Sequence, residues 1–377
     1  MFSQSQILQA YNKAIKSRKN KLEWIMFNRE IEKNLNEILN GLNNKSYIHW
    51  KYKKIILNDG KKRYIFSPHI RDHIIHHLLY ENIYRLLDKK IPYNSFASRK
   101  WKWIHKWLEY FTKKLKVLNK KQDNLWYMKV DMSKYFYTID HKELKKKLFK
   151  FIKNEDSRYL INLIIDGYKA PDIYDHLFPK DWNYNTTKNK WVPIWAITSQ
   201  VFANFYLYDI DHHINHNLKP QIYLRYMDDL IFVDKLENLK KIKVDVLNKL
   251  NNNKLFIVYN RVKINKLSEG INLLGFRIKI NDNKVSVQVS KNNKKKIWKL
   301  TDNLKKINFD SLNKSDLKRV QSVIESRKSH FKHSFKYDNY LKEYSLTANN
   351  LMDFLLFRSS MLKKVAKILT NKEKTIT

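Results

Sequence analysis

Three aspartates carry the strongest chemical signal in this sequence. Asp228 and Asp229 are adjacent within the apolar, β-prone stretch LRYMDDLIFVDK, and Asp131 ends a second apolar stretch, WYMKVD, 97 residues before Asp228. A short turn between two strands would present the paired carboxylates at one edge of a sheet. Adjacent carboxylates repel each other, so the arrangement calls for a positive counter-charge.

Divalent cations fit this set of oxygen donors. Oxygen ligands favour Mg²⁺, which typically binds one or two carboxylates together with substrate phosphates. Two strand-borne carboxylate positions suit two metal ions that assist in-line phosphoryl transfer to a 3′-hydroxyl. We therefore expect Asp131, Asp228 and Asp229 to be catalytic ligands of two Mg²⁺ ions, with Mn²⁺ as a substitute. For an isolated pair of aspartates, an acidic surface turn would be the simpler interpretation.

The charge of the chain indicates a polyanionic partner. Its 377 residues include 75 lysines and arginines against 36 aspartates and glutamates, which gives a net charge of +39. Such an excess favours nucleic acid as the partner and, second, an anionic membrane. An AT-rich genome would also raise the lysine content, so part of the excess has a compositional explanation. The hydrophobic content of 43% is enough for a sizeable core.

Other classes of protein are disfavoured. The chain has no cysteine, which excludes disulfides, cysteine-based zinc sites and thiol nucleophiles. No apolar run reaches 18 residues, and the first 20 residues lack the apolar core of a signal peptide. We therefore expect a cytoplasmic location and no membrane partner.

The apolar spacing predicts mixed helices and strands around the aspartates. Residues 4–41 have helical periodicity, with Gly41 as the expected C-terminal cap. Residues 52–68 predict a hairpin that turns at Asn58-Asp59-Gly60. Further helices are expected at 71–89, 104–118, 141–166 and 236–252, strand–turn patterns at 126–139 and 222–235, and a hairpin at 271–290.

With these motifs in order, the sequence resembles the bacterial reverse transcriptases of group II introns, retrons and diversity-generating elements. YMDD (226–229) and VDMSKYFYTIDH (130–141) resemble the catalytic palm motifs, and PIWAITSQVFANFYLYDID (193–211) resembles the palm helix. INLLGFRI (271–278) resembles the primer grip, and the segments 61–79 and 94–106 resemble the fingers. The resemblance covers roughly residues 5–345.

The resemblance implies further site residues. The backbone of Met132 would join the three aspartates at the metal ions, and Phe136 would exclude a ribose 2′-hydroxyl and so favour deoxynucleotides. Leu274 and Gly275 would contact the primer. The residues implied to bind the nucleotide are Lys61, Arg63, Arg71, Phe136, Gln200 and Lys263. Simpler interpretations are a core position for Phe136 and solvated side chains for the others.

Tryptophan replaces glycine at three positions of the resembled motifs. These residues are Trp101 and Trp103 in RKWKWIHK and Trp195 in PIWAITSQ. Glycine lets a backbone approach nucleic acid closely, whereas tryptophan adds a large stacking surface. The substitutions are either drift or a change in how the template is handled, and we favour altered template handling.

The resemblance implies an α+β, right-hand polymerase fold with fingers, palm and thumb. The expected domains are N-terminal helices and fingers at 1–125, an antiparallel palm at 126–288 with a helical insertion at 141–190, and a basic helical thumb at 289–377. The implied activity is that of an RNA-directed DNA polymerase, in bacterial anti-phage defence and with an atypical or restricted template.

Two alternatives remain open. One is the reverse transcriptase of a diversity-generating retroelement, and the other is a non-catalytic nucleic-acid-binding protein with a polymerase fold. The expected partners are a template RNA or associated non-coding RNA, a DNA product and deoxynucleotides. A protein partner or a second copy of the chain also stays open.

Overall fold

The computed structural model describes most of the chain up to residue 296. The described residues are 1–16, 18–58, 62–121, 124–168, 189–281 and 284–296, together with residues 299 and 322. They form two compact units, of which the first comprises Met1–Trp103 and Trp126–Asn265 and the second Ile104–Leu125 and Lys266–Thr377. Nearly all of the predicted thumb, 289–377, lies outside the described residues, and the division into fingers, palm and thumb stays a prediction.

The N-terminal part of the first unit is helical. Its helices are α1 (Gln4–Ile15), α2 (Leu22–Arg29), α3 (Ile31–Asn43) and α4 (Ile70–Asp88). The predicted helical segment therefore consists of three helices. Its predicted cap is wrong, because Gly41 lies inside α3 and Asn44 caps the helix instead. The Gly41 carbonyl accepts the N–H groups of Ser46 and Tyr47, so the chain turns back over this glycine.

A hairpin connects α3 to α4. Strand β1 (Lys53–Asn58) pairs antiparallel with β2 (Lys62–Ser67), and Asn58 lies opposite Lys62. This confirms the predicted hairpin, whereas Asp59 and Gly60 of its predicted turn lie outside the described residues.

The central sheet of the first unit is built mainly from antiparallel pairs. Its strand order is β4-β5-β3-β6, for β3 (Trp126–Asp131), β4 (Ile222–Tyr226), β5 (Asp229–Asp234) and β6 (Ile264–Lys266). Strand β5 pairs antiparallel with both β3 and β4. It is buried from Leu230 to Asp234 and so runs through the core. This arrangement confirms the α+β fold class.

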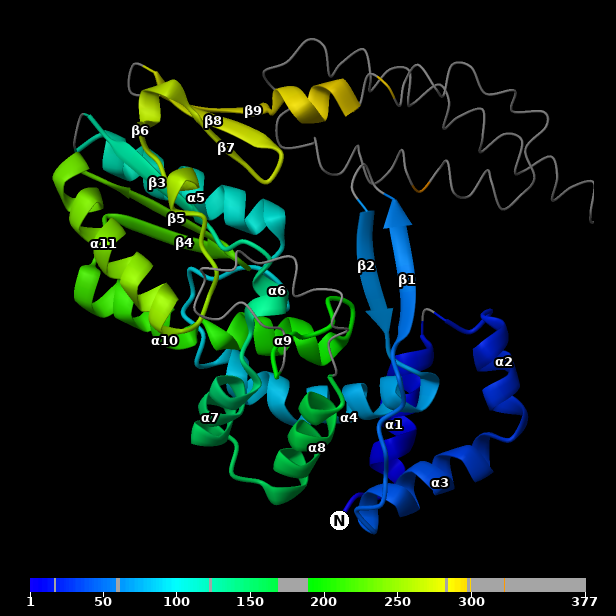
Figure 1. Ribbon diagram of the computed structural model, residues 1–377. Coiled ribbons are helices and arrows are strands. Elements are labelled where there is room, and N and C mark those ends of the chain that lie inside the picture. Colours follow the sequence, from blue (N-terminus) through cyan, green and yellow to red (C-terminus); the bar gives the residue numbers. More distant parts are fainter. Residues whose placement is uncertain are drawn as a thin grey trace, which may run out of the picture. The chain divides into compact units, whose positions relative to one another are not determined.

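Helices surround this sheet. They are α6 (Tyr135–Thr138), α7 (His141–Phe151), α8 (Glu155–Asp166), α9 (Ile197–Tyr206), α10 (Tyr208–His213), the π-helix η2 (Ile214–Leu218), α11 (Leu236–Asn252) and the 3₁₀ helix η3 (Tyr259–Arg261). Helix α11 packs on β3 and β5, whereas α9 packs against α4 (Figure 1). Side-chain caps start two of the helices, since Asp140 accepts the N–H of Glu143 in α7 and Asn154 that of Ser157 in α8.

The second unit pairs one helix with a three-stranded sheet. Its elements are α5 (Ile104–Asn119), the 3₁₀ helix η4 (Leu267–Glu269), β7 (Ile271–Leu273), β8 (Phe276–Asn281) and β9 (Lys284–Val289). The strands are antiparallel in the order β7-β8-β9, and α5 packs on β9. Leu274 and Gly275 form the β7–β8 turn, both with positive φ (47° and 88°), as the two-residue turn of a twisted hairpin requires.

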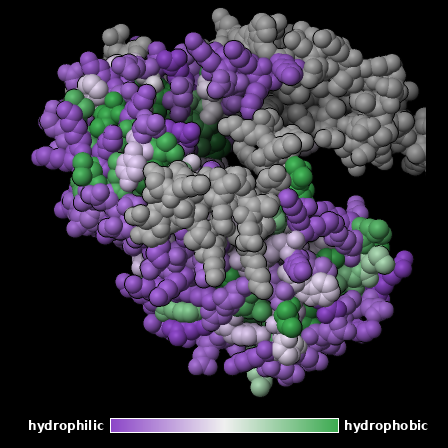
Figure 2. Space-filling view, in the orientation of Figure 1, coloured by the Kyte–Doolittle hydropathy of each residue, from purple (hydrophilic) through white to green (hydrophobic). Residues whose placement is uncertain are grey.

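The described surface is strongly polar. Figure 2 shows hydrophilic residues over most of the described atoms on the visible face. Within the described part of the chain, no helix is both long enough and apolar enough to cross a bilayer.

A buried ion pair ties the central sheet to the helices. Arg225 of β4 and Asp211 of α10 are both fully buried, and the guanidinium donates to both Asp211 carboxylate oxygens at 2.6–3.0 Å. Arg225 also donates to the Asn204 side chain and main-chain carbonyl in α9. Through its backbone, Arg225 bonds to Asn94 and Phe96, so that segment continues the sheet beyond β4.

We expect Arg225→Met or Asp211→Leu alone to lower the free energy of unfolding by about 3–5 kcal/mol, because either change leaves one buried charge without its partner. The double variant should regain part of this loss, since an apolar pair of similar volume removes both charges. Denaturant unfolding measures the effect. Lys145→Met is the control, because Lys145 pairs with the exposed Asp166 and should cost less than about 1 kcal/mol. A single variant as stable as this control would contradict the assignment.

Candidate active site

The sheet brings the three predicted aspartates to one edge. In the register of β3 and β5, Asp131 lies directly opposite Asp229. Tyr226 pairs with Asp229, so Met227 and Asp228 form the two-residue turn between β4 and β5. Met227 has a φ of +56°, as the first central residue of such a turn needs. The predicted strand–turn–strand pattern around the aspartates is therefore confirmed.

Met132 connects the end of β3 to this turn. Its N–H donates to the carbonyl of Asp228 at 3.3 Å, and the residue forms an antiparallel bridge with Ile257. The Met132 side chain is buried, so any contact with a metal ion would have to come from its backbone carbonyl. Its role as a ligand stays a prediction.

The carboxylates interact electrostatically. Partial burial is the main cause that raises the pKa of Asp228 to about 6, and the negative charges of Asp229 and Asp131 act in the same direction. Burial also raises the pKa of Asp229, although Lys129 opposes this shift. Carboxylates that disfavour their own ionisation in this way are stabilised by a nearby cation. The donor set therefore fits a divalent metal ion.

In this structure the cation beside the aspartates is a lysine. Lys129 of β3 forms an ion pair with Asp229, with 2.9 Å between Nζ and Oδ1. Among the residues that the structure describes, no three His, Asp or Glu side chains converge on one point as a formed metal site. The backbone thus brings the aspartates together, but Asp229 would have to leave Lys129 to join a shared site.

Arg225 and Asp211 position the turn and were not predicted. Nη1 of Arg225 donates to the carbonyl of Met227 at 3.0 Å, directly before Asp228. The available signal was an arginine inside the otherwise apolar strand IYLRY, because a buried arginine needs a carboxylate partner.

Gln200 joins the two loops that carry the predicted template residues. Its Oε1 accepts the hydroxyl of Ser98 at 2.9 Å, and its Nε2 donates to the carbonyl of Ile194. Trp101 follows Ser98 by three residues, and Trp195 follows Ile194 directly. The Gln200 amide therefore fixes these loops against α9, and its predicted contact with the nucleotide stays a prediction.

All three unusual tryptophans are exposed. The exposed fractions are 79% for Trp101, 51% for Trp103 and 56% for Trp195. The first two indole rings lie next to each other, with 6.2 Å between their centroids. Exposed indoles offer faces on which an unpaired base could stack, so their predicted template role remains a prediction with a suitable geometry.

Trp101 adopts a backbone conformation that favours glycine. Its φ is +65°, in the left-handed region that bulky side chains rarely occupy. Such a backbone conformation costs about 1–3 kcal/mol and persists only where the surrounding structure enforces it. Here the loop is enforced by Arg99, whose guanidinium donates to the Asp88 carboxylate and to the carbonyls of Asp88, Pro92 and Ser95.

A polar network connects the first turn of α9 to α4 and to Tyr168. Thr198 Oγ1 lies 2.6 Å from Nδ1 of His76 in α4, and Ser199 Oγ lies 3.1 Å from the hydroxyl of Tyr168. On its other side, His76 lies 3.3 Å from the hydroxyl of Tyr52. The threonine and serine of the TSQ motif therefore anchor the helix, which leaves Gln200 to hold the loops.

Phe136 lies on α6, the helix that follows the strand ending at Asp131. It is half-buried on α6, five residues after Asp131, and its ring meets that of Tyr135 edge to face at 5.7 Å. Its carbonyl accepts the N–H of Val192, which precedes the Trp195 loop. Its sugar-excluding role stays a prediction.

The other predicted residues have varied surroundings. Arg71 donates to Glu37 and Asn34 of α3, so its charge is already compensated. Lys263 is exposed, and Leu274 and Gly275 belong to the second unit. Lys61 lies outside the described residues, as does the side chain of Arg63, whose backbone lies in β2. The nucleotide or primer roles of these residues stay predictions.

We expect Trp101→Gly to keep or raise the free energy of unfolding, by up to about 1 kcal/mol, because glycine adopts positive φ without steric cost. Trp103→Gly is the matched control, since it removes the same ring contact from a residue without positive φ. It should lower the stability by about 0.5–1 kcal/mol, because glycine adds freedom to the unfolded chain. Thermal unfolding of both variants makes the comparison; an equal loss would show that the left-handed backbone costs nothing.

Comparisons with known proteins support the polymerase interpretation. The sequence model of the reverse transcriptase (RNA-dependent DNA polymerase) family matches residues 51–278. A search of curated proteins finds no match.

Solved structures of telomerase are similar in part. An apo telomerase from Candida tropicalis is 16% identical, covers 67% of this chain and has a TM-score of 0.46. Telomerases from Candida albicans and Candida tropicalis, each with a fragment of telomeric RNA, are 13% identical, cover 84% and 80% of this chain and have TM-scores of 0.46. This chain covers 59%, 64% and 57% of these three telomerase chains, in the order given.

The family match spans both strands that carry the aspartates, the turn between β4 and β5, and the TSQ helix. The chain belongs to the reverse transcriptase family.

Proposed function

We propose that this protein is an active RNA-directed DNA polymerase that adds deoxynucleotides to a 3′-hydroxyl. The observation that carries the proposal is the register that sets Asp131 opposite Asp229, beside Asp228 in the adjoining turn. Three carboxylates at one sheet edge are what two-metal phosphoryl transfer requires. The same register makes an acidic surface turn an insufficient explanation.

The chain's own residues would hold and orient the reactants. Asp131, Asp228 and Asp229, with the Met132 carbonyl, would hold two Mg²⁺ ions. The ions, or Mn²⁺ in their place, would supply charge stabilisation and a lowered pKa at the attacking hydroxyl. Lys129 would then exchange Asp229 for solvent or for a substrate phosphate. Phe136 would exclude a ribose 2′-hydroxyl.

The finer proposal concerns the template. We propose a role in bacterial anti-phage defence with a restricted template, supported by the three exposed indoles on the loops that Gln200 joins. The partners in this proposal are a template or associated RNA, deoxynucleotides and the DNA product. A diversity-generating role would instead need ordinary copying of a heteropolymeric template.

A second candidate is a non-catalytic nucleic-acid-binding protein. The ion pair between Lys129 and Asp229 favours it, because a permanent lysine partner would replace the metal ions. The raised pKa of Asp228 argues for catalysis, since a single lysine leaves that carboxyl uncompensated. A polymerase assay with and without Mg²⁺ separates the two candidates.

Changing any one of the three aspartates to asparagine should lower nucleotide incorporation by at least about a hundredfold, which corresponds to about 2.7 kcal/mol of lost transition-state stabilisation. Incorporation is measured with a primed RNA template and labelled deoxynucleotides. Asp245→Asn is the control, because Asp245 lies on α11 and pairs with His213 of α10, away from the three aspartates in the sequence. Full activity in an active-site variant would remove that residue from the metal site, and an inactive wild type would support the non-catalytic candidate.

On a heteropolymeric RNA template, the wild type should give a product of restricted composition, such as a homopolymer or short repeat. The indoles would stack on an unpaired base or exclude the ordinary template path, and such stacking is worth about 1–3 kcal/mol per base. Sequencing the products of wild type and Trp195→Gly tests this. Trp50→Gly is the control, because Trp50 is similarly exposed, at 53%, but does not belong to these loops. Faithful full-length copying by the wild type would refute the restriction.

A further inference from the structure

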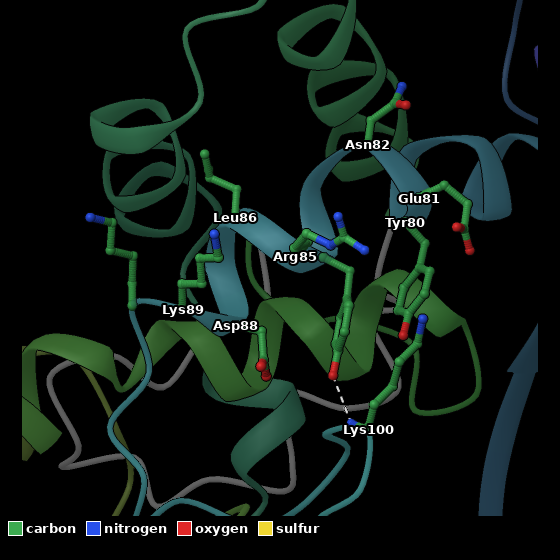
Figure 3. A pocket seen from close by; sticks show the side chains of 10 residues that line it. Tyr80, Glu81, Asn82, Arg85, Leu86, Asp88, Lys89 and Lys100 are labelled. Atoms are coloured by element: carbon green, nitrogen blue, oxygen red, sulfur yellow. Dashed lines mark hydrogen bonds between the residues drawn. The ribbon is translucent and has the colours of Figure 1, made fainter.

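A basic and aromatic groove lies on α4, outside the aspartate site. It has a volume of about 990 Å³ and is lined by residues of the C-terminal half of α4, by Lys89 and Lys90 directly after the helix, and by Lys100 (Figure 3). A groove of this size reaches the upper end of the range for small-molecule pockets, which is roughly 300–1,000 Å³. Its lining residues are mostly polar or charged, and Leu86 is the one aliphatic residue among them.

One wall of the groove presents a pair of aromatic rings. Tyr80 and Tyr84, one helical turn apart, are stacked with 4.8 Å between their centroids and 22° between their planes. The Nζ of Lys100 lies 5.8 Å and 5.1 Å from these two centroids, which places its charge over both rings. The backbone N–H of Lys100 donates to the Tyr84 hydroxyl at 2.7 Å and fixes this arrangement.

The charges of the groove are unbalanced. Its two carboxylates, Glu81 and Asp88, are paired with Lys13 and Arg99, which do not line the groove. Its cations are Arg85, Lys89, Lys90 and Lys100, and none of them forms an ion pair within the described part of the chain. The groove therefore keeps a positive potential that an anionic ligand would compensate.

From this combination we infer that the α4 groove binds a single strand of RNA, as a second nucleic-acid site apart from the aspartates. Cations that follow a phosphate backbone form a single-strand site together with accessible aromatic rings. Tyr80 and Tyr84 are half-buried but keep part of their surface at the groove. A duplex would hide the faces of its bases from Tyr80 and Tyr84. A membrane surface would need several apolar side chains that insert together, whereas Leu86 is the one aliphatic residue of the lining. RNA is chosen over DNA because RNA is the template in the proposed function, on which this choice of strand rests.

The groove is joined to the candidate active site by one short loop. Ser98 bonds to Gln200, Arg99 to Asp88, and Lys100 to Tyr84, in three consecutive residues. Trp101 and Trp103 follow on the same loop. A strand held in the groove would thus lie beside the segment that carries the indoles. RNA bound in the groove would contact the loop whose Ser98 is hydrogen-bonded to Gln200.

Equilibrium binding of a mixed-sequence, single-stranded RNA without nucleotides or Mg²⁺ tests the site independently of polymerase activity. The triple variant Arg85→Gln, Lys89→Gln, Lys90→Gln should bind about tenfold more weakly or worse. The slope of log affinity against log salt concentration should become shallower by about 2, because each of the three lost phosphate contacts on a single strand contributes about 0.7. The control removes the same charge from exposed lysines near α11, with Lys235→Gln, Lys240→Gln and Lys241→Gln.

Stacking is tested separately. Tyr84→Leu should weaken single-stranded RNA binding by about fivefold or more and change binding of a blunt RNA duplex less. Wild-type protein cross-linked to 4-thiouridine RNA should yield an RNA-bearing peptide from 80–100, a readout that requires no variant to fold.

Three results would overturn the inference: equal losses in the groove and control triples, equal losses for duplex and single strand, or cross-links confined to other peptides. Tighter groove-dependent binding of single-stranded DNA than of RNA would overturn the choice of RNA. If the wild type binds through the groove but incorporates no nucleotide, the proposed function fails and the groove site stands.

Discussion

The position of the turn that carries Asp228 depends on one buried arginine. Arg225 sits in the strand that leads into the turn, and its guanidinium bonds to Asp211, to Asn204 and to the carbonyl of Met227. Its backbone N–H and carbonyl are hydrogen-bonded to the backbone of Asn94 and Phe96. A single residue thus connects α10, α9, the loop before Trp101 and the turn that presents Asp228. Because a buried charge is tolerated only when fully paired, these elements can shift only together.

A second constraint is electrostatic and lies at the sheet edge. The register that places Asp131 opposite Asp229 gathers negative charge where Asp228 is partly buried. Lys129 compensates one carboxylate from the neighbouring strand. The site is therefore held in a state that a divalent cation would stabilise further, and Lys129 is positioned to exchange its partner. Other lysines lie away from the aspartates, such as Lys89 and Lys90 at the α4 groove.

The sequence was informative where chemistry and periodicity coincide. The aspartate turn, the β1–β2 hairpin and α11 could be predicted, because apolar alternation and turn residues act locally. The limits of the N-terminal helices could not, since the end of α3 depends on Tyr47 folding back onto Gly41. The pairing of Arg225 with Asp211 also escaped prediction, because it joins residues 14 apart through tertiary packing. Gln200 was placed on the correct helix, but its contact with Ser98 joins residues 102 apart and is set by the loop.

Trp101 combines a bulky side chain with a backbone conformation that favours glycine. The four hydrogen bonds from the Arg99 guanidinium fix the backbone of the residues directly before Trp101. Trp101 then adopts the left-handed conformation that suits glycine. With 79% of its surface exposed, the indole gains little packing that could offset this strain. This backbone cost has no packing gain beside it, which is compatible with the ligand contact proposed for the indole. The ring of Trp103 lies next to that of Trp101, and Lys100 of the same loop lies over the stacked tyrosines of α4. One short segment thus contacts both aromatic pairs, which is the feature from which we infer an unpaired strand as the ligand.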